Sequence, residues 1–307
     1  MKTPEELRER IRALCRERNA VILAHNYELG EIQEIADFCG DSLELSIKAA
    51  ATDADVLLFC GVRFMAETAK ILSPAKTVLL PVPDAPCSMA EMIDAETVRQ
   101  LKAAHPGALA VCYVNTTAAV KAECDLCVTS SNALELVSAL PRDREIIFVP
   151  DRNLGAYCAE KTGRKMIFAD GCCPVHQRLT PAMIERRRRE YPGFPVLIHP
   201  EAPAETRRLA DAVLSTGAML RETAVRPEPG FLVATEIGIL HRMERERPDK
   251  RFVPVSAEAV CPYMKLIQLS DVVAALEGMR YEIRLPEALR ARAELPIRRM
   301  LEKDLKF

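Results

Sequence analysis

Residues 171–178 read GCCPVHQR, with two adjacent cysteines and a histidine three residues beyond Cys173. Thiolate sulfur and imidazole nitrogen are metal ligands, and an imidazole can also move protons near neutral pH. Adjacent cysteines are nevertheless more often packing residues, because free cysteine behaves as a small hydrophobic side chain. The stretch alone therefore does not say which sulfur does chemistry, or with which partners.

The chain holds 11 cysteines in 307 residues. An odd number, together with an N-terminus that lacks a signal-peptide core, argues against a disulfide framework. The only CxxC pair is Cys124 and Cys127, so a local zinc or ferredoxin-type ligand set is missing. This pair is either a redox pair or buried packing, and packing is favoured. The same applies to Cys15, Cys39, Cys60, Cys112 and Cys158. Any metal cluster must be assembled from cysteines far apart in the chain.

Three blocks of the sequence repeat the same features in the same order, at offsets of 86 to 88 residues. Each block has polar residues at a predicted strand end, a hydroxyl residue 17 positions later, and a closing cysteine. The strand-end residues are His25 and Tyr27, Tyr113 and Asn115, and His199 and Glu201. The hydroxyl residues are Ser42, Ser130 and Thr216. The closing cysteines are Cys87, Cys173 and Cys261, so Cys173 rather than Cys172 is the repeated position.

Short apolar runs such as AVILAH, DVLLFC, ALAVCYV, EIIFVP and FLVAT alternate with helical patterns. This alternation predicts an α/β fold with parallel sheets. We expect three homologous three-layer αβα domains with short parallel sheets, arranged around a pseudo-threefold axis. The expected domains are 1–87, with the C-terminal segment 262–307 packing back on it, then 88–173 and 174–261. No glycine-rich nucleotide-binding motif follows any strand.

This arrangement predicts a shared site. Ligands bind at the carboxyl ends of parallel strands, and helix N-termini favour anions. Three lobes would bring one cysteine each to the same centre. Three thiolates on an iron–sulfur cluster leave one iron open, and an open iron can act as a Lewis acid. The sequence thus favours dehydration or condensation of a small anionic substrate.

Bulk composition restricts the class of protein. Hydrophobic residues make up 49% and charged residues 28%, and the net charge of −2 argues against a nucleic-acid binder. The basic run Arg186–Arg189 fits a solvated helix face. No apolar stretch approaches the roughly 20 residues that span a bilayer. We therefore expect a cytoplasmic protein that binds neither nucleic acid nor membrane.

The blocks resemble the quinolinate synthase family of de novo NAD biosynthesis over nearly the whole chain. The matching stretches are AHNY at 24–27, GDSLELS at 40–46, FCGVRFMAETAKIL at 59–72, YVNTTAAVKAECDLCVTSSNA at 113–133, CPVH at 173–176, HPE at 199–201, STG at 215–217, TE at 235–236 and CPYMK at 261–265. Ala202 and Ala234 depart from the pattern typical of the family, which puts loop detail in doubt. The resemblance implies a transferase-type condensing enzyme with a 4Fe-4S cluster held by Cys87, Cys173 and Cys261. It implies that iminoaspartate condenses with dihydroxyacetone phosphate to quinolinate, releasing phosphate and two waters.

Roles within the site are expectations of two kinds. Catalytic roles in proton transfer are expected for Tyr113, Glu201, His199, His25 and Tyr27. Substrate contacts are expected from His25, Ser42, Tyr113, Asn115, Ser130, His176, His199, Glu201 and Thr216. We expect the Tyr113 and Glu201 side chains to exchange protons during enolisation and phosphate loss. For the three hydroxyl residues, the alternative role is simple helix N-capping. For His176, the alternative is contact with a ligand of the cluster instead of the substrate.

Two other functions remain open. One is an iron–sulfur hydro-lyase acting on a hydroxy acid, which would not release phosphate from dihydroxyacetone phosphate. The other is a metal-free protein of three lobes that binds a sugar or an amino acid. Because iminoaspartate is unstable, a synthase would depend on an aspartate oxidase or dehydrogenase as its source.

Overall fold

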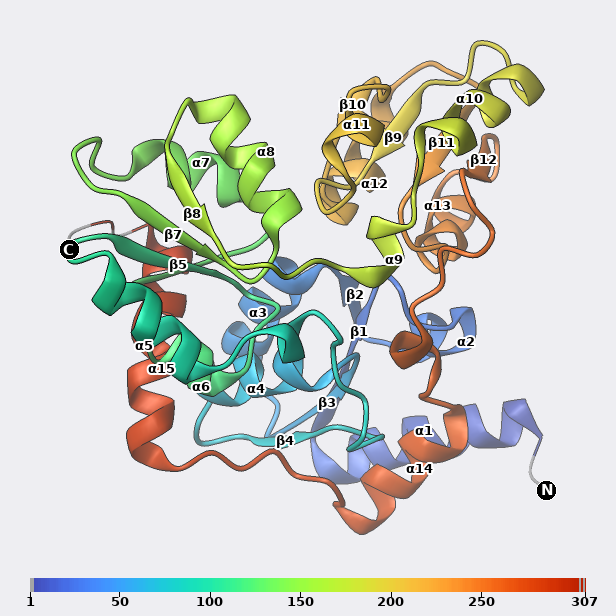
Figure 1. Ribbon diagram of the computed structural model, residues 1–307. Helices are drawn as coiled ribbons and strands as arrows, with labels where there is room; N and C mark the ends of the chain where they lie inside the picture. The colour runs from blue at the N-terminus through green and yellow to red at the C-terminus, as the bar shows by residue number, and fades with distance from the viewer. Residues whose placement is uncertain (1–2, 304, 306) are drawn as a thin grey trace.

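The computed structural model describes residues 3–303, 305 and 307. It contains three four-stranded sheets, and every strand pair in them is parallel (Figure 1). The strand orders are β2-β1-β3-β4, β6-β5-β7-β8 and β10-β9-β11-β12, which is one topology used three times. The predicted α/β class with three repeated units is therefore confirmed.

Each lobe alternates strands and helices as the sequence predicts. The first contains α1 (Pro4–Arg18), β1 (Ala20–His25), α2 (Gly30–Ile35), β2 (Phe38–Gly40), α3 (Ser42–Ala51), β3 (Val56–Cys60), α4 (Arg63–Leu72) and β4 (Thr77–Leu79). The second contains the 3₁₀ turn η1 (Ala90–Met92), α5 (Ala95–Ala104), β5 (Leu109–Tyr113), α6 (Ala118–Lys121), β6 (Leu126–Val128), α7 (Ala133–Ala139), β7 (Ile146–Val149), α8 (Arg152–Thr162) and β8 (Met166–Phe168). The third contains α9 (Pro174–Gln177), α10 (Pro181–Glu190), β9 (Val196–Ile198), α11 (Ala204–Arg207), β10 (Ala212–Val213), α12 (Thr216–Val225), β11 (Gly230–Ala234), α13 (Ile239–Glu246) and β12 (Arg251–Pro254).

The central strands form where the sequence has continuous apolar runs. All residues of β3, β5, β7 and β11 are buried, as expected for parallel strands covered by helices on both faces. Helix starts also follow the local sequence. Thr3 and Glu6 form a capping box at the start of α1, with Pro4 in the first helical position.

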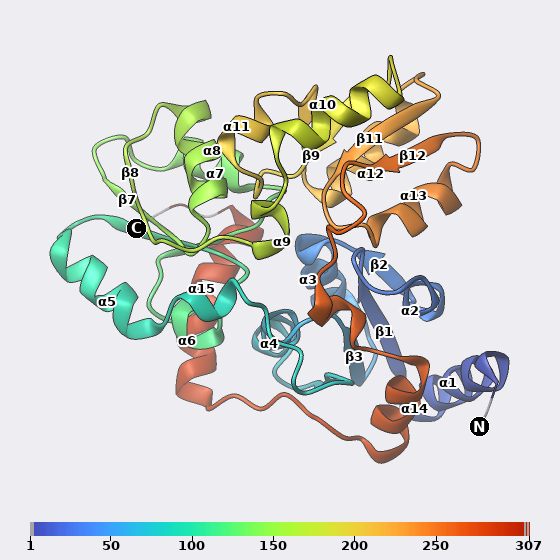
Figure 2. The ribbon, with the colours of Figure 1, turned by 45° about the vertical axis from the view of Figure 1, so that its right-hand side comes forward.

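The C-terminal segment consists of the 3₁₀ turn η2 (Pro262–Lys265), α14 (Leu269–Gly278) and α15 (Glu287–Glu302). Helix α14 packs on α1 of the first lobe, as Figures 1 and 2 show. Helix α15 instead lies mainly against α6 and β6 of the second lobe, and also touches α4. The segment from η2 to α15 thus packs back on the first lobe through α14, as expected, and in addition contacts the second lobe through α15.

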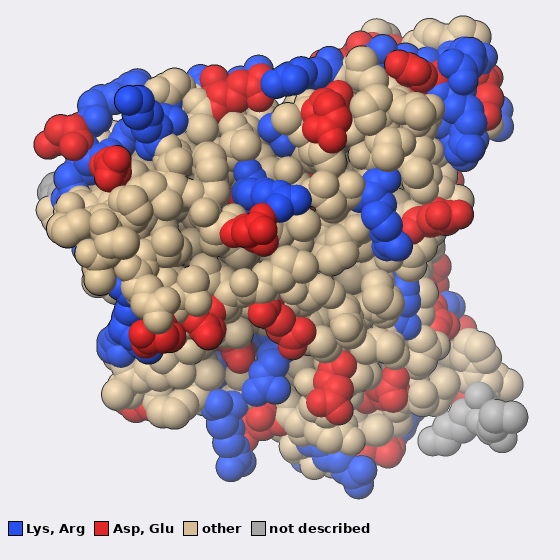
Figure 3. All heavy atoms as spheres, viewed as in Figure 1, with Lys and Arg blue, Asp and Glu red and all other residues tan. Residues whose placement is uncertain are grey.

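Charged side chains of both signs are interspersed on the face drawn in Figure 3. Within the described part of the chain, none of the helices has the length and apolar character needed to cross a membrane.

Candidate active site

A cavity of about 580 Å³ lies where the three lobes meet. All of the predicted site residues line it: His25, Tyr27, Ser42, Cys87, Tyr113, Asn115, Ser130, Cys173, His176, His199, Glu201, Thr216 and Cys261. Strands β1 and β5 end at His25 and Tyr113, and His199 follows β9 directly. Each of these strands is flanked on one side by an edge strand and on the other by the rest of its sheet. The strand order reverses beside each of these three strands, which is where open parallel sheets bind ligands.

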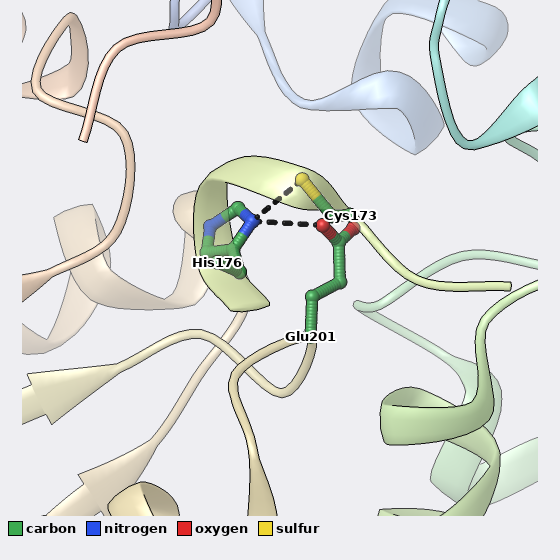
Figure 4. Close-up of side chains that lie close together, drawn as sticks. All are labelled: Cys173, His176 and Glu201. Carbon is green, nitrogen blue, oxygen red and sulfur yellow. Dashed lines mark hydrogen bonds and ion pairs between the residues drawn. The ribbon is translucent and has the colours of Figure 1, made fainter. Parts of the chain in front are cut away.

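Glu201 lies at the centre of a hydrogen-bonded group on the cavity wall. The hydroxyl of Tyr113 donates to its Oε1 at 2.5 Å, and Nδ1 of His176 lies 2.9 Å from its Oε2. The same Nδ1 is 3.1 Å from Sγ of Cys173 (Figure 4). Donor atoms of Cys173, His176 and Glu201 lie within 4.8 Å of one another, so this group could also hold a metal ion.

The group continues through the other nitrogen of His176. Its Nε2 is 2.7 Å from Oγ1 of Thr235, which in turn is 2.5 Å from the hydroxyl of Tyr27. The ring of His199 stacks on that of His176 with centroids 4.8 Å apart. Side chains from all three lobes therefore share one buried polar network.

His25 and His199 are oriented in the same way in their two lobes. Nδ1 of His25 accepts the backbone N–H of Tyr27 at 3.2 Å, and Nδ1 of His199 accepts that of Glu201 at 3.4 Å. A neutral imidazole that accepts at Nδ1 carries its proton on Nε2. Burial lowers the pKa of His25 to about 4 and that of His199 to about 3. Both rings are thus neutral at pH 7, with Nε2–H as the donor.

The pKa values of the tyrosines and of Glu201 in this network shift in opposite directions. Burial raises the pKa of the Tyr113 and Tyr27 hydroxyls well above 10, and the Glu201 carboxylate acts in the same direction. Burial would also raise the pKa of Glu201, but His199, His176 and the Tyr113 hydroxyl outweigh it and lower that pKa overall. Glu201 is consequently an ionised acceptor beside the protonated hydroxyl of Tyr113.

The three repeated hydroxyl residues do not serve as the helix caps. Asp41 caps α3 and Ser215 caps α12, so Ser42 and Thr216 occupy the first helical positions. Ser130 lies two residues before Asn132, which is the N-cap position of α7. The alternative of simple N-capping is therefore wrong for these three residues, although all of them line the cavity beside helix starts.

Cys87, Cys173 and Cys261 bring one free thiol from each repeated block to the cavity. Burial raises the pKa of Cys87 to about 12, with a further contribution from the Cys261 thiol. Burial also raises the pKa of Cys173, and Cys87 adds to it. The Cys87 thiol therefore interacts electrostatically with each of the other two.

Backbone N–H groups of the turn that follows each cysteine act to lower the pKa of its thiol, against the effect of burial. These groups belong to Met89 and Ala90 for Cys87, to His176 for Cys173, and to Tyr263 and Met264 for Cys261. A lowered pKa favours the thiolate form, which is the form that binds iron. The donor set fits a group held by three thiolates.

Sequence reasoning missed Glu236 as a site residue. It lines the cavity, accepts the backbone N–H of Cys261 at 3.1 Å, and pairs with Lys265 at 2.9 Å. Glu236 follows β11 by two residues, so the strand-end criterion that found His199 could have found it. Cys124 and Cys127 lie buried outside the cavity lining.

Three parallel-sheet lobes that enclose thiols, neutral imidazoles and an ionised carboxylate define the class, an α/β enzyme with a shared central site. The profile described as "Quinolinate synthetase A protein" matches residues 9–302. The chain is 50% identical to the quinolinate synthase of Dehalococcoides mccartyi strain CBDB1, over 97% of this chain and 98% of that protein. It is 48% identical to the quinolinate synthase of Geotalea uraniireducens, over 97% of each chain, and 50% identical to that of Methanoregula boonei, over 96% of this chain and 97% of that protein. The chain belongs to the quinolinate synthetase A family.

Proposed function

We propose that this enzyme condenses iminoaspartate with dihydroxyacetone phosphate to form quinolinate, with release of phosphate and two waters. The name shared by its relatives supports this activity. The observation that carries the proposal is the convergence of three thiols, one from each block, beside a network of proton-transfer groups in one cavity.

In this proposal, Cys87, Cys173 and Cys261 hold a 4Fe-4S cluster. With three protein ligands, the bound cluster would supply one iron as a Lewis acid for a substrate hydroxyl or carboxylate. Cys173 serves as a sulfur ligand while His176 and Glu201 remain available to the substrate. The turn N–H groups behind each sulfur support the thiolates.

The remaining residues bind the substrate and move protons. Ser42, Ser130 and Thr216 are placed to bind carboxylate and phosphate oxygens beside helix starts. Ionised Glu201 can take a proton released on enolisation, and the Tyr113 hydroxyl can hand one to a departing oxygen and recover it from Glu201. The Nε2–H groups of His25 and His199 can donate hydrogen bonds that orient the substrate.

The proposal includes the organisation of the chain and its supply of substrate. The lobes divide at 1–87, 88–173 and 174–261, with the cluster cysteines at or beside each boundary. An aspartate oxidase or dehydrogenase produces the unstable imine in the same compartment, which we take to be the cytoplasm.

The test is quinolinate formation by anaerobically purified protein, supplied with an iminoaspartate source and dihydroxyacetone phosphate. We expect quinolinate by mass spectrometry, with one phosphate released per quinolinate. The Cys261→Ala variant should lose both the thiolate-to-iron absorption and activity. Cys158→Ala serves as the control, because Cys158 is a buried cysteine that does not line the cavity. Colourless, iron-free wild-type protein would contradict the cluster, and iron without phosphate release would favour a hydro-lyase.

A further inference from the structure

Lys121, the last residue of α6, is fully buried although it carries an ammonium group. Its Nζ donates to the carbonyl oxygen of Val114 at 2.7 Å and to that of Thr116. It also lies 5.5 Å from the ring centroid of Phe64, which lines the cavity. Within residues 3–303, 305 and 307, no carboxylate forms a salt bridge with it. An apolar side chain of similar volume would be cheaper to bury, so the charge calls for a specific explanation.

The two carbonyl groups that Lys121 binds flank Asn115 on either side. Asn115 lines the cavity, and its Oδ1 is buried with no hydrogen-bond partner among the described residues. A buried amide oxygen without a partner is costly, and a ligand in the cavity would supply the missing donor. Asn115 is thus held in an orientation in which no described residue donates a hydrogen bond to its amide oxygen.

The turn around Asn115 is fixed at further points. The Thr116 hydroxyl donates to the Tyr113 carbonyl at 3.0 Å, and the Thr116 N–H donates to the Val114 carbonyl at 2.8 Å. The Ala118 N–H donates to Oε2 of Glu67 at 2.9 Å. Lys121 is the one charged group that binds this turn from both sides of Asn115 in the described structure.

We propose that Lys121 is a positioning residue for Asn115: its ammonium group clamps the flanking carbonyls so that the Asn115 amide faces the substrate. The inference rests on the proposed function for the identity of that substrate. Lys121 does not line the cavity, so it acts through Asn115 rather than by contact.

The test compares Lys121→Met with Lys102→Met in the holoenzyme. Met preserves the length of the side chain but removes its donors. Lys102 is a fitting control, because it also donates to a carbonyl oxygen in the same lobe, that of Glu123. It is half-buried, pairs with Asp125, and makes none of the described hydrogen bonds to the turn around Asn115. For Lys121→Met we expect KM for quinolinate formation to rise by about tenfold with a smaller change in kcat. The control should keep the wild-type KM.

A double-mutant cycle with Asn115→Ala separates positioning from general stability. If Lys121 acts through Asn115, the double variant should show a KM no higher than that of Asn115→Ala alone. Additive effects on KM, or a wild-type KM in Lys121→Met, would overturn the inference. Should Lys121→Met fail to fold, Thr116→Val loosens the same turn without stranding a charge. For Thr116→Val we expect a smaller rise in KM than for Lys121→Met, and no rise when Asn115 is already replaced by Ala. A Thr116→Val enzyme with a lowered Tm but an unchanged KM would contradict the positioning role of this turn.

A wild-type enzyme that makes no quinolinate would refute the proposed function. The positioning role of Lys121 would then be tested by hydrogen exchange, which does not depend on activity. Hydrogen exchange at the Thr116 and Ala118 amides should be at least about tenfold faster in Lys121→Met than in Lys102→Met. Equal exchange in the two variants would show that Lys121 does not hold the turn.

Discussion

The carboxylate of Glu201 accepts from Tyr113 on one oxygen and faces His176 with the other. Neither interaction depends on a bound ligand, so the carboxylate is fixed before the substrate enters. Pre-fixed acceptors and donors need little reorganisation when a proton moves. Proton transfer at Glu201 therefore depends on single hydroxyl and imidazole groups, and conservative substitutions can remove these groups one at a time.

Tyr113→Phe removes the donor to Glu201 and keeps the ring. We expect kcat for quinolinate formation to fall by at least about tenfold, since positioned proton transfer contributes on this scale or more. Steady-state assays on anaerobic protein would measure it. Tyr191→Phe is the control, because Tyr191 lies outside the cavity lining; a Tyr113→Phe enzyme with wild-type kcat would remove this hydroxyl from the mechanism.

The buried histidines predict how stability depends on pH. The pKa values of His25 and His199 are lowered by burial to about 4 and about 3, below the 6.5 of an unfolded histidine. Between those values the unfolded chain binds more protons, so acidification destabilises the fold. We expect the free energy of unfolding to fall from pH 6.5 downward, by up to about 1.4 kcal/mol per pH unit for each histidine.

Denaturant titrations between pH 5 and 7 would measure this slope. His199→Gln should make it shallower, because the unfolded chain then lacks one histidine that burial keeps neutral in the fold. An unaltered slope in His199→Gln would mean that this ring is not the one that resists protonation.

Most of the residues that sequence could predict share one property, which is that they repeat; His176 is an exception. His25, Tyr113 and His199 recur at fixed offsets, so the three-lobed arrangement follows from counting alone. Lys121 and Thr235 have no such pattern, because their roles arise from contacts with backbone and side chains folded around them. Such partners are set by tertiary packing rather than by spacing.

At the scale of elements, the starts of α3, α7 and α12 meet through side chains. The Ser131 hydroxyl donates to Oδ2 of Asp41 at 2.6 Å and lies 2.9 Å from Oγ of Ser215. Asp41 and Ser215 are themselves the caps of α3 and α12. One hydroxyl thus ties a helix start from each lobe together.

Ser131→Ala should lower the free energy of unfolding by about 1 kcal/mol, because two hydrogen-bond partners lose their shared hydroxyl. Ser138→Ala is the natural comparison, since Ser138 donates only to the Leu134 carbonyl one turn back in α7. Denaturation curves of the two variants would decide the matter, and equal stabilities would mean that the link between lobes contributes nothing.

The long apolar strands were predictable, whereas the short edge strands β2 and β10 were not. Strands β2 and β10 contain three and two residues, too few to show a period in sequence. They exist because β1 and β9 offer them an unpaired edge, as in the parallel pairing of Phe38 with Leu23. Their place in the fold is decided by the neighbouring strand.

At the scale of the whole molecule, α15 joins two lobes. Its residues Ala293, Ile297 and Met300 are buried, and Arg299 donates to the Asp125 carbonyl at 2.7 Å. The preceding segment returns along the first sheet, where Ile283 donates to the Val78 carbonyl at 2.8 Å. The C-terminal residues therefore contribute to the packing of both lobes.

Ile297→Ala should reduce the free energy of unfolding by about 2 to 5 kcal/mol, the usual range when a large aliphatic side chain is removed from a core. Leu295→Ala lies two residues away in the same helix but at a side chain that is 53% exposed, against 0% for Ile297. We expect that control to change stability by no more than about 0.5 kcal/mol. Similar losses in both variants would indicate a general helix effect instead of packing between lobes.

The three lobes share one topology, but the ends of their central strands carry imidazole, phenol and imidazole at His25, Tyr113 and His199. A chamber with identical walls would admit an unsymmetrical reactant in three equivalent poses. Here the three poses are made unequal by the Tyr113 phenol, and two residues further along each lobe by Tyr27, Asn115 and Glu201, so a molecule with unlike ends meets different groups in each pose. Three lobes of the same topology can then select the regiochemistry of ring closure through the different side chains at their strand ends.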